Sequence, residues 1–200
     1  MTRLKVVGLD LAGVEKRPTG FCRLSGLQAQ TREVYTDSEI LKEIGVDSPK
    51  VVAIDAPLSL PPGRQTIEQR TGQHLREADR ELLCRRIRFF PITLGPMRQL
   101  TKRGMNLKAV LGELGFLAIE VYPGGAQDLL GIPRKQQGLD KLRVGLEGLG
   151  LRDLNINMSD HELDAVTCAY VGKLFLDGKS VTYGSSETGI VMPRDKGTSP

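Results

Sequence analysis

The sequence is poor in aromatic residues. Phe and Tyr make up 4% of its 200 residues and Trp is absent, so platforms of stacked aromatic side chains for single-stranded nucleic acid are poorly supplied. Contact with a nucleic acid would therefore have to be mainly electrostatic.

Cysteines and long hydrophobic runs are also scarce. The three cysteines, Cys22, Cys84 and Cys168, are far apart and form no C-x-x-C motif, which argues against a disulfide framework and a cysteine zinc site. No apolar stretch approaches the roughly 20 residues of a membrane helix, and the N-terminus lacks the pattern of a signal peptide. We expect a soluble cytoplasmic protein that does not bind membranes.

The positive charge is concentrated in the middle of the chain. The net charge is +4, but Arg64 to Lys108 holds 11 basic and 4 acidic residues, which gives +7, while the remaining 155 residues carry −3. This asymmetry indicates a basic surface for an anionic partner.

The order of hydrophobic segments predicts one α/β domain over residues 1–193, followed by a disordered tail over 194–200. Apolar runs predict strands at 4–9, 20–24, 31–35, 51–55 and 116–122, and a late hairpin or short extended pieces at 181–183 and 190–192. Helical patterns cover 36–45, 66–88, 97–114, 126–130, 139–149 and 159–176. Thr36 and Glu39 form a capping box at the first helix, with Gly45 expected at its end.

Four acidic residues stand where hydrophobic elements end or are interrupted. Asp10 ends the first strand, Asp55 ends the fourth, Glu120 lies near the end of the fifth and Asp164 lies in the last helix. If the first and fourth strands are parallel neighbours, their aspartates project from the same edge of the sheet. Clustered carboxylates require a cation or a shared proton, and oxygen ligands favour Mg²⁺ or Mn²⁺ over zinc.

These residues also have structural interpretations. Asp10 and Asp55 suit turns, and Glu120 inside an apolar strand suits an ion pair with an arginine. Asp160 at a helix start favours the helix dipole. His161 could bind a metal, transfer protons or cap the helix.

A series of motifs resembles a known family. They are Val6 to Gly13 with Thr19-Gly20, Ala53 to Leu58, Arg76 to Arg80, Glu120 to Pro123, His161 to Ala165 and Glu187 to Pro193. In this order they are similar to the domain-of-unknown-function family 429, predicted RNase H-like nucleases of the RuvC-like superfamily. The resemblance implies an RNase H-like fold, with a five-stranded mixed sheet flanked by helices on both faces, and metal-dependent phosphodiester hydrolysis.

The resemblance also implies roles for the acids. Asp10, Asp55 or Glu120, and Asp164 stand at the family's acidic positions, and we expect all four to be catalytic and to bind Mg²⁺ or Mn²⁺. RuvC-type resolvases often carry a further acid three residues before the last one. Here His161 holds that place, so it is an accessory candidate together with Asp160.

The basic segment supplies candidate substrate-binding residues. Arg76, Asp79 and Arg80 share one face of the predicted helix over 66–88. We expect Arg76, Arg80 and Arg85 to bind substrate phosphates, with Asp79 as an accessory residue. The alternative is a solvated ladder of ion pairs.

Three functions fit these features. The first is a divalent-metal-dependent nuclease acting on DNA or RNA, for which the resemblance also allows a homodimer. The second is a non-catalytic basic module that binds nucleic acid, and its support is the charge asymmetry. The third is a single-domain nucleotide or phosphate-ester hydrolase, because the pattern Gly8 to Gly13 with Thr19-Gly20 is similar to the phosphate loop of sugar kinases and actin-like ATPases.

Overall fold

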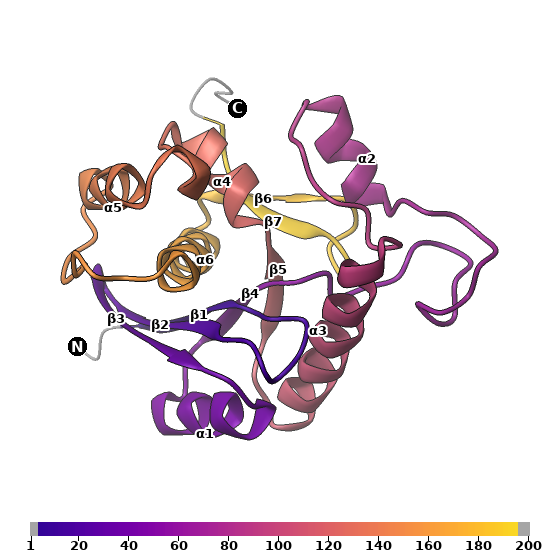
Figure 1. Cartoon of the computed structure of the whole chain (residues 1–200), viewed down its shortest axis with the longest axis horizontal. Coiled ribbons are helices and arrows are strands. Elements are labelled where there is room, and N and C mark those ends of the chain that lie inside the picture. The colour runs from indigo at the N-terminus through magenta and orange to yellow at the C-terminus, as the bar shows by residue number, and fades with distance from the viewer. Residues whose placement is uncertain (1–3, 196–200) are drawn as a thin grey trace.

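A seven-stranded mixed sheet runs through the centre of the molecule (Figure 1). The computed structural model describes residues 4–195. The strands are β1 (Lys5–Asp10), β2 (Thr19–Ser25), β3 (Gln28–Val34), β4 (Val51–Asp55), β5 (Ala118–Val121), β6 (Ser180–Tyr183) and β7 (Ile190–Pro193), in the order β3-β2-β1-β4-β5-β7-β6. The pairs β1–β4, β4–β5 and β5–β7 are parallel, while β1–β2, β2–β3 and β6–β7 are antiparallel.

The prediction of five strands is wrong, whereas the mixed α/β architecture is confirmed. The two short segments near the C-terminus form the antiparallel hairpin β6–β7, and β7 pairs in parallel with β5. This pairing covers the edge of β5, whose backbone groups would otherwise be exposed as an unpaired strand edge.

Helices cover both faces of the sheet (Figure 1). The helices are α1 (Asp37–Asp47), α2 (Glu77–Cys84), α3 (Gly95–Glu113), α4 (Pro123–Leu130), α5 (Leu139–Gly148) and α6 (Asp160–Leu176), with a 3-10 turn η1 (Lys135–Gln137). Val7 and Leu9 belong to the core under α1 and α3, while Val6 belongs to the core under α5 and α6. This alternation along β1 follows the two-residue period of a strand.

Helix α1 begins at the predicted capping box but ends later than predicted. The Glu39 N–H donates to Thr36 Oγ1 (3.1 Å), and the Thr36 N–H donates to Glu39 Oε2 (3.0 Å). The helix continues past Gly45 to Asp47, and Ser48 takes the left-handed conformation at its end, with φ 43°.

The predicted long helix over 66–88 is wrong, since only α2 is helical there. The chain from 59 to 76 is irregular, and Gly72 has φ +96°. The buried Arg64 guanidinium donates to the carbonyl oxygens of Gln69 and Gln73. Interactions with this central arginine therefore replace the helical hydrogen bonds.

Two glycines allow α6 to lie directly on the sheet. A Cβ at Gly8 would stand 2.1 Å from the Ala165 carbonyl oxygen, and one at Gly20 would stand 2.0 Å from that of His161. Such distances are too short for any side chain. The glycines therefore bring the first turns of α6 against the ends of β1 and β2.

The described residues end shortly after β7. Arg194 Nε donates to the Ser180 carbonyl oxygen (3.0 Å), so the first residue of the predicted tail contacts β6. Residues 196–200 of that tail lie outside the described residues. No helix between residues 4 and 195 is long and apolar enough to cross a membrane.

Candidate active site

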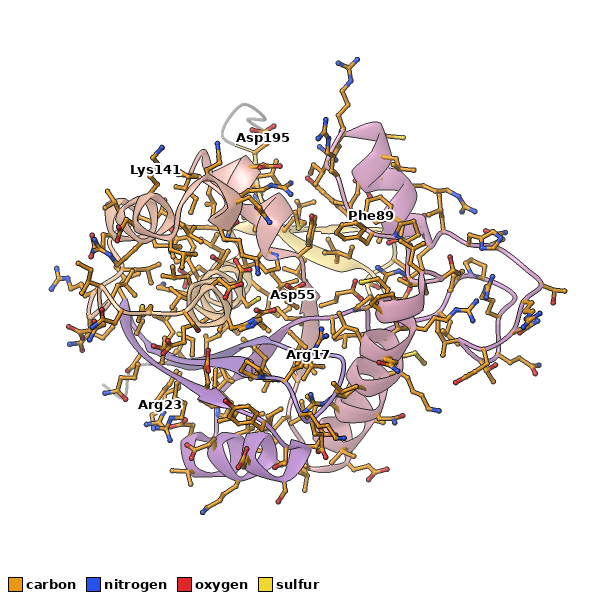
Figure 2. All side chains as sticks on the ribbon, in the orientation of Figure 1. Arg17, Arg23, Asp55, Phe89, Lys141 and Asp195 are labelled. Atoms are coloured by element: carbon orange, nitrogen blue, oxygen red, sulfur yellow. The ribbon has the colours of Figure 1, made fainter. Side chains whose placement is uncertain are left out.

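Asp10 and Asp55 lie side by side at the carboxyl ends of β1 and β4. They are register partners in the parallel pair, so their side chains point to the same face of the sheet. That face is the one covered by α6, since Val6, four residues before Asp10, and Ala53, two residues before Asp55, pack in the core with α6. Asp55 lies at the centre of the molecule (Figure 2).

Helix α6 adds His161 beside Asp10. The Asp10 carboxylate accepts a hydrogen bond from His161 Nδ1, with 2.7 Å between Nδ1 and Oδ2. This hydrogen bond raises the pKa of His161, although partial burial of the imidazole opposes the shift. The imidazole therefore holds Asp10 in place and offsets part of its charge.

Asp164, one turn further along α6, is held by two polar side chains. Its Oδ1 accepts a hydrogen bond from Gln127 Nε2 (2.8 Å), and its Oδ2 lies 2.9 Å from Lys135 Nζ. Burial raises the pKa of Asp164, and the Lys135 charge works against that rise. Lys135 also reaches Asp160 Oδ2 at 3.1 Å, so one ammonium group bridges two acids of α6.

Asp55 is the acid without a compensating partner. Across residues 4–195 we find no hydrogen bond or ion pair to its carboxylate. Its pKa lies well above the usual value because it is buried and because the charges of Asp10 and Asp164 oppose its ionisation; Lys135 offsets part of this. The charges of these three acids therefore act on one another, and Asp55 is the one whose carboxyl group has no direct partner among residues 4–195.

Glu120 does not join these acids. It is the register partner of Ile54, not of Asp55, so its side chain leaves the opposite face of the sheet. Glu120 Oε2 accepts hydrogen bonds from Arg76 Nη1 and the Leu58 N–H, both at 2.7 Å. Burial raises its pKa against the effect of Arg76. The ion-pair interpretation fits this geometry, and the expected metal-binding role does not.

Arg76 is correspondingly not a surface residue. Its side chain is 6% exposed and bridges Glu120 and Asp79, with 2.8 Å to Asp79 Oδ1. A guanidinium held by two carboxylates fits the ion-pair alternative better than phosphate binding by Arg76, and the accessory role of Asp79 stays a prediction. Arg80 and Arg85 are exposed on and after α2, where their phosphate-binding role stays a prediction.

The residues that sequence reasoning missed are Lys135 and Gln127. Both lie in the stretch 124–155, which is rich in Gly and Leu and shows no chemical motif. Only the packing of α4 and η1 against α6 brings them to Asp164. No spacing rule in the sequence indicates this contact.

The acids suit a hard divalent cation. Within residues 4–195, no three His, Cys, Asp or Glu side chains are close enough to form a ready-made metal cage. Mg²⁺, however, usually keeps several waters and is held by one or two carboxylates together with substrate phosphates. The unpaired Asp55 beside Asp10 fits a site of that kind, with Asp164 next to it.

Comparisons with known proteins agree with this architecture. A structure of Thermus thermophilus RuvC is 14% identical and superimposes with a TM-score of 0.50, covering 94% of this chain and 100% of that one. It shares the fold. A second structure, of T. thermophilus RuvC in complex with a Holliday junction substrate, gives 14% identity and a TM-score of 0.49 over 94% of this chain and 99% of that one.

Sequence comparisons place the chain in a family. No curated protein matches it. The model of a family described as "Protein of unknown function (DUF429)" matches residues 8–188, which confirms the resemblance seen in the motifs. The chain therefore belongs to the DUF429 family.

Proposed function

We propose that this protein is a nuclease that hydrolyses phosphodiester bonds of DNA or RNA with the help of a divalent metal ion. Asp10, Asp55 and Asp164 would hold Mg²⁺ or Mn²⁺ at the carboxyl edge of the sheet. The RuvC-like fold and the family are consistent with this function. Glu120 has no part in the proposal.

The observation that carries the proposal is the partly buried carboxyl group of Asp55, which has no partner among residues 4–195. A desolvated carboxyl group next to two further acids is costly to ionise unless a cation compensates it. The neighbouring ion pairs show how the rest of the fold avoids that cost: Glu120 has Arg76, and Asp164 has Lys135. Asp55 alone is left for a ligand from outside the described residues.

The protein's own groups fix the positions of the other two acids. A divalent ion bound there would supply an activated water and stabilise the leaving oxygen. His161 holds Asp10, and Gln127 and Lys135 hold Asp164. Since a misplaced catalytic group lowers the rate strongly, these hydrogen bonds contribute by positioning.

The choice of a nucleic acid as substrate depends on the charge distribution. Arg85, Arg86 and Arg88 are exposed directly after α2, in the basic middle of the chain. Exposed arginines neutralise backbone phosphates and bring a polyanion to the site without reading its sequence.

The test is a cleavage assay with labelled single- and double-stranded DNA and RNA, in Mg²⁺, Mn²⁺ or EDTA. We expect cleavage that requires the metal and is lost in Asp10→Asn, while the exposed control Glu113→Gln cleaves like the wild type. Full activity in Asp10→Asn would exclude the proposed site. Salt-sensitive binding without cleavage in any metal would instead support the non-catalytic module, and hydrolysis of free nucleotides alone would support the phosphate-ester hydrolase.

A further inference from the structure

A cavity of about 290 Å³ opens beside the three acids. Asp55, Asp164 and Lys135 line one part of it. Most of the remaining wall is apolar and comes from α2, the α2–α3 connection, the first turn of α3 and the residue after β5, with Leu82, Phe89, Phe90, Ile92, Met97 and Tyr122. The ion-paired Arg76, Asp79 and Glu120 also line the cavity. The volume is near the lower end of the range for small-molecule sites, about 300–1,000 Å³.

Aromatic side chains gather at this cavity although the chain has few of them. Of the five Phe and four Tyr in the sequence, Phe89, Phe90 and Tyr122 all line it. The Arg134 guanidinium, also in the wall, lies over the Tyr122 ring at 5.8 Å. Figure 2 shows Phe89 near α2, above the central Asp55.

Phe90 is not used by the core. It is 73% exposed, the largest exposed fraction among the large hydrophobic residues described. Three exposed arginines, Arg85, Arg86 and Arg88, precede it in the sequence, and only Phe89 separates it from Arg88. Cations followed by an accessible ring are the combination with which proteins bind single-stranded nucleic acid, through the backbone charge and through stacking of the bases.

We propose that the cavity binds one unpaired nucleobase, stacked against Phe90 and Phe89, of the strand whose phosphate reaches Asp55. The inference rests on the proposed function for the position of that phosphate. It makes the substrate a single strand or a locally unpaired nucleotide. Gln136, which lines the cavity and has no hydrogen-bond partner among the described residues, supplies an amide for the edge of the base.

The wall offers both kinds of surface that a nucleotide requires. A base is planar and neutral and suits the apolar side chains, while the phosphate is anionic and needs cations. Lys135 lines the cavity and lies 2.9 Å from Asp164. A fully apolar ligand would leave the acids and Lys135 without a role, whereas an ordinary duplex would keep its bases stacked and out of the cavity.

The test measures binding in EDTA, where no metal-dependent cleavage occurs. The probes are a fluorescent single-stranded oligonucleotide, the same strand with every base replaced by an abasic site, the matching duplex and a free nucleoside monophosphate. The variants are Phe90→Ala, Phe90→Trp to retain stacking, and Leu94→Ala as a control. Leu94 is 47% exposed at the start of α3 and does not line the cavity.

Base stacking on one aromatic side chain is worth a factor of about 5 to 150 in affinity. We therefore expect Phe90→Ala to weaken binding of the single strand by such a factor, with Phe90→Trp and Leu94→Ala close to the wild type. The abasic strand should bind weakly to all four proteins. If Phe90→Ala weakens binding of both the monophosphate and the single strand, the pocket binds free nucleotides and strands alike. If it weakens binding of the single strand alone, the pocket binds strands only.

Equal affinity of wild type and Phe90→Ala for the single strand, or equal binding of the intact and abasic strands, would overturn the proposal. Neither result depends on hydrolysis. If the protein cleaves nucleic acid but Phe90→Ala binds the single strand as tightly as the wild type, the base pocket is refuted and the proposed nuclease function stands. If Phe90→Ala weakens binding of the single strand but the protein never cleaves, the nuclease function is refuted and the base pocket stands.

Discussion

Replacing Asp55 with asparagine should stabilise the metal-free protein. The two side chains are similar in size, so the substitution removes mainly the charge. Asp55 has no hydrogen bond or ion pair among residues 4–195, and burial together with the charges of Asp10 and Asp164 raises its pKa. Its ionisation at neutral pH therefore opposes folding, and a neutral amide at this position does not.

The size of the effect follows from the positions of the strands. Adjacent strands are about 4.8 Å apart, and two carboxylates at about 5 Å repel by about 3 kcal/mol with an effective dielectric constant of about 20. His161 on Asp10 and Lys135 on Asp164 reduce this repulsion, so we expect a gain of about 1–3 kcal/mol. In a domain of this size about 1 kcal/mol moves Tm by about 2–4 °C, which gives a rise of about 2–12 °C.

Thermal unfolding in EDTA over a series of pH values measures this effect. Because the pKa of Asp55 is higher in the folded than in the unfolded chain, the folded state binds more protons between the two values. The stability that protonated Asp55 contributes is therefore lost as the pH rises from the pKa of the carboxyl group in the unfolded chain, about 3.9, through its raised pKa in the folded protein. The advantage of Asp55→Asn should vanish at low pH, and Glu113→Gln should show none.

Added Mg²⁺ should reverse the order of the two proteins. A ligand that binds only the folded state at 100 times its Kd stabilises it by about 2.7 kcal/mol. The wild type should gain such an increment, and Asp55→Asn much less. If Asp55→Asn is no more stable than the wild type in EDTA, the carboxylates are not crowded and the argument for a cation at this edge fails.

Four further substitutions test the structural roles of residues around the site. Glu120→Gln leaves the buried Arg76 with one counter-charge fewer, so the free energy of unfolding measured in urea should fall by about 3–5 kcal/mol. The rise in Tm on adding Mg²⁺ should persist in this variant. If that rise is lost, Glu120 belongs to the metal site after all. Gly20→Ala places a Cβ 2.0 Å from a carbonyl oxygen of α6 and should lower both Tm and cleavage, whereas Gly45→Ala, with no atom within 4 Å, should stabilise by up to about 1 kcal/mol. Lys135→Gln removes the cation between two acids of α6, so Tm in EDTA should fall and the Mg²⁺-induced rise should exceed that of the wild type; a smaller rise would contradict a compensating role.

The sequence was sufficient to predict the edge of the sheet where the acids meet. Asp10 and Asp55 follow two apolar runs, and the helix between these runs allows a parallel pair, which the structure contains. Strand period also separates Glu120 from them, because its side chain follows the face of Ala118 and not that of Ile119. The positions of these side chains relative to one another also depend on the register between β4 and β5. This register depends on tertiary packing and cannot be predicted from the sequence of either strand.

Other features depend on contacts that no local pattern contains. The stretch 66–88 has an apolar stripe with helical spacing, yet its first half is held by hydrogen bonds from the Arg64 side chain to backbone carbonyl oxygens. Lys135 reaches α6 from a turn about thirty residues earlier in the chain. In both cases a long side chain reaches polar groups outside its own helical or strand pattern, so periodicity and capping rules do not predict the contact.

The arginines in the basic middle of the chain are of two kinds, buried and exposed. Arg64, Arg76 and Arg103 are buried and donate hydrogen bonds to carbonyl or carboxylate oxygens of the protein, so their charges stabilise the fold and do not reach the surface. The local net charge of +7 therefore overstates the positive charge at the surface. What remains accessible includes the short run Arg85 to Arg88, and it leads directly into Phe89 and Phe90 at the cavity beside Asp55. The scarcity of aromatic residues thus does not argue against a stacked base, because Phe89 and Phe90 directly follow the exposed arginines and line the cavity beside Asp55.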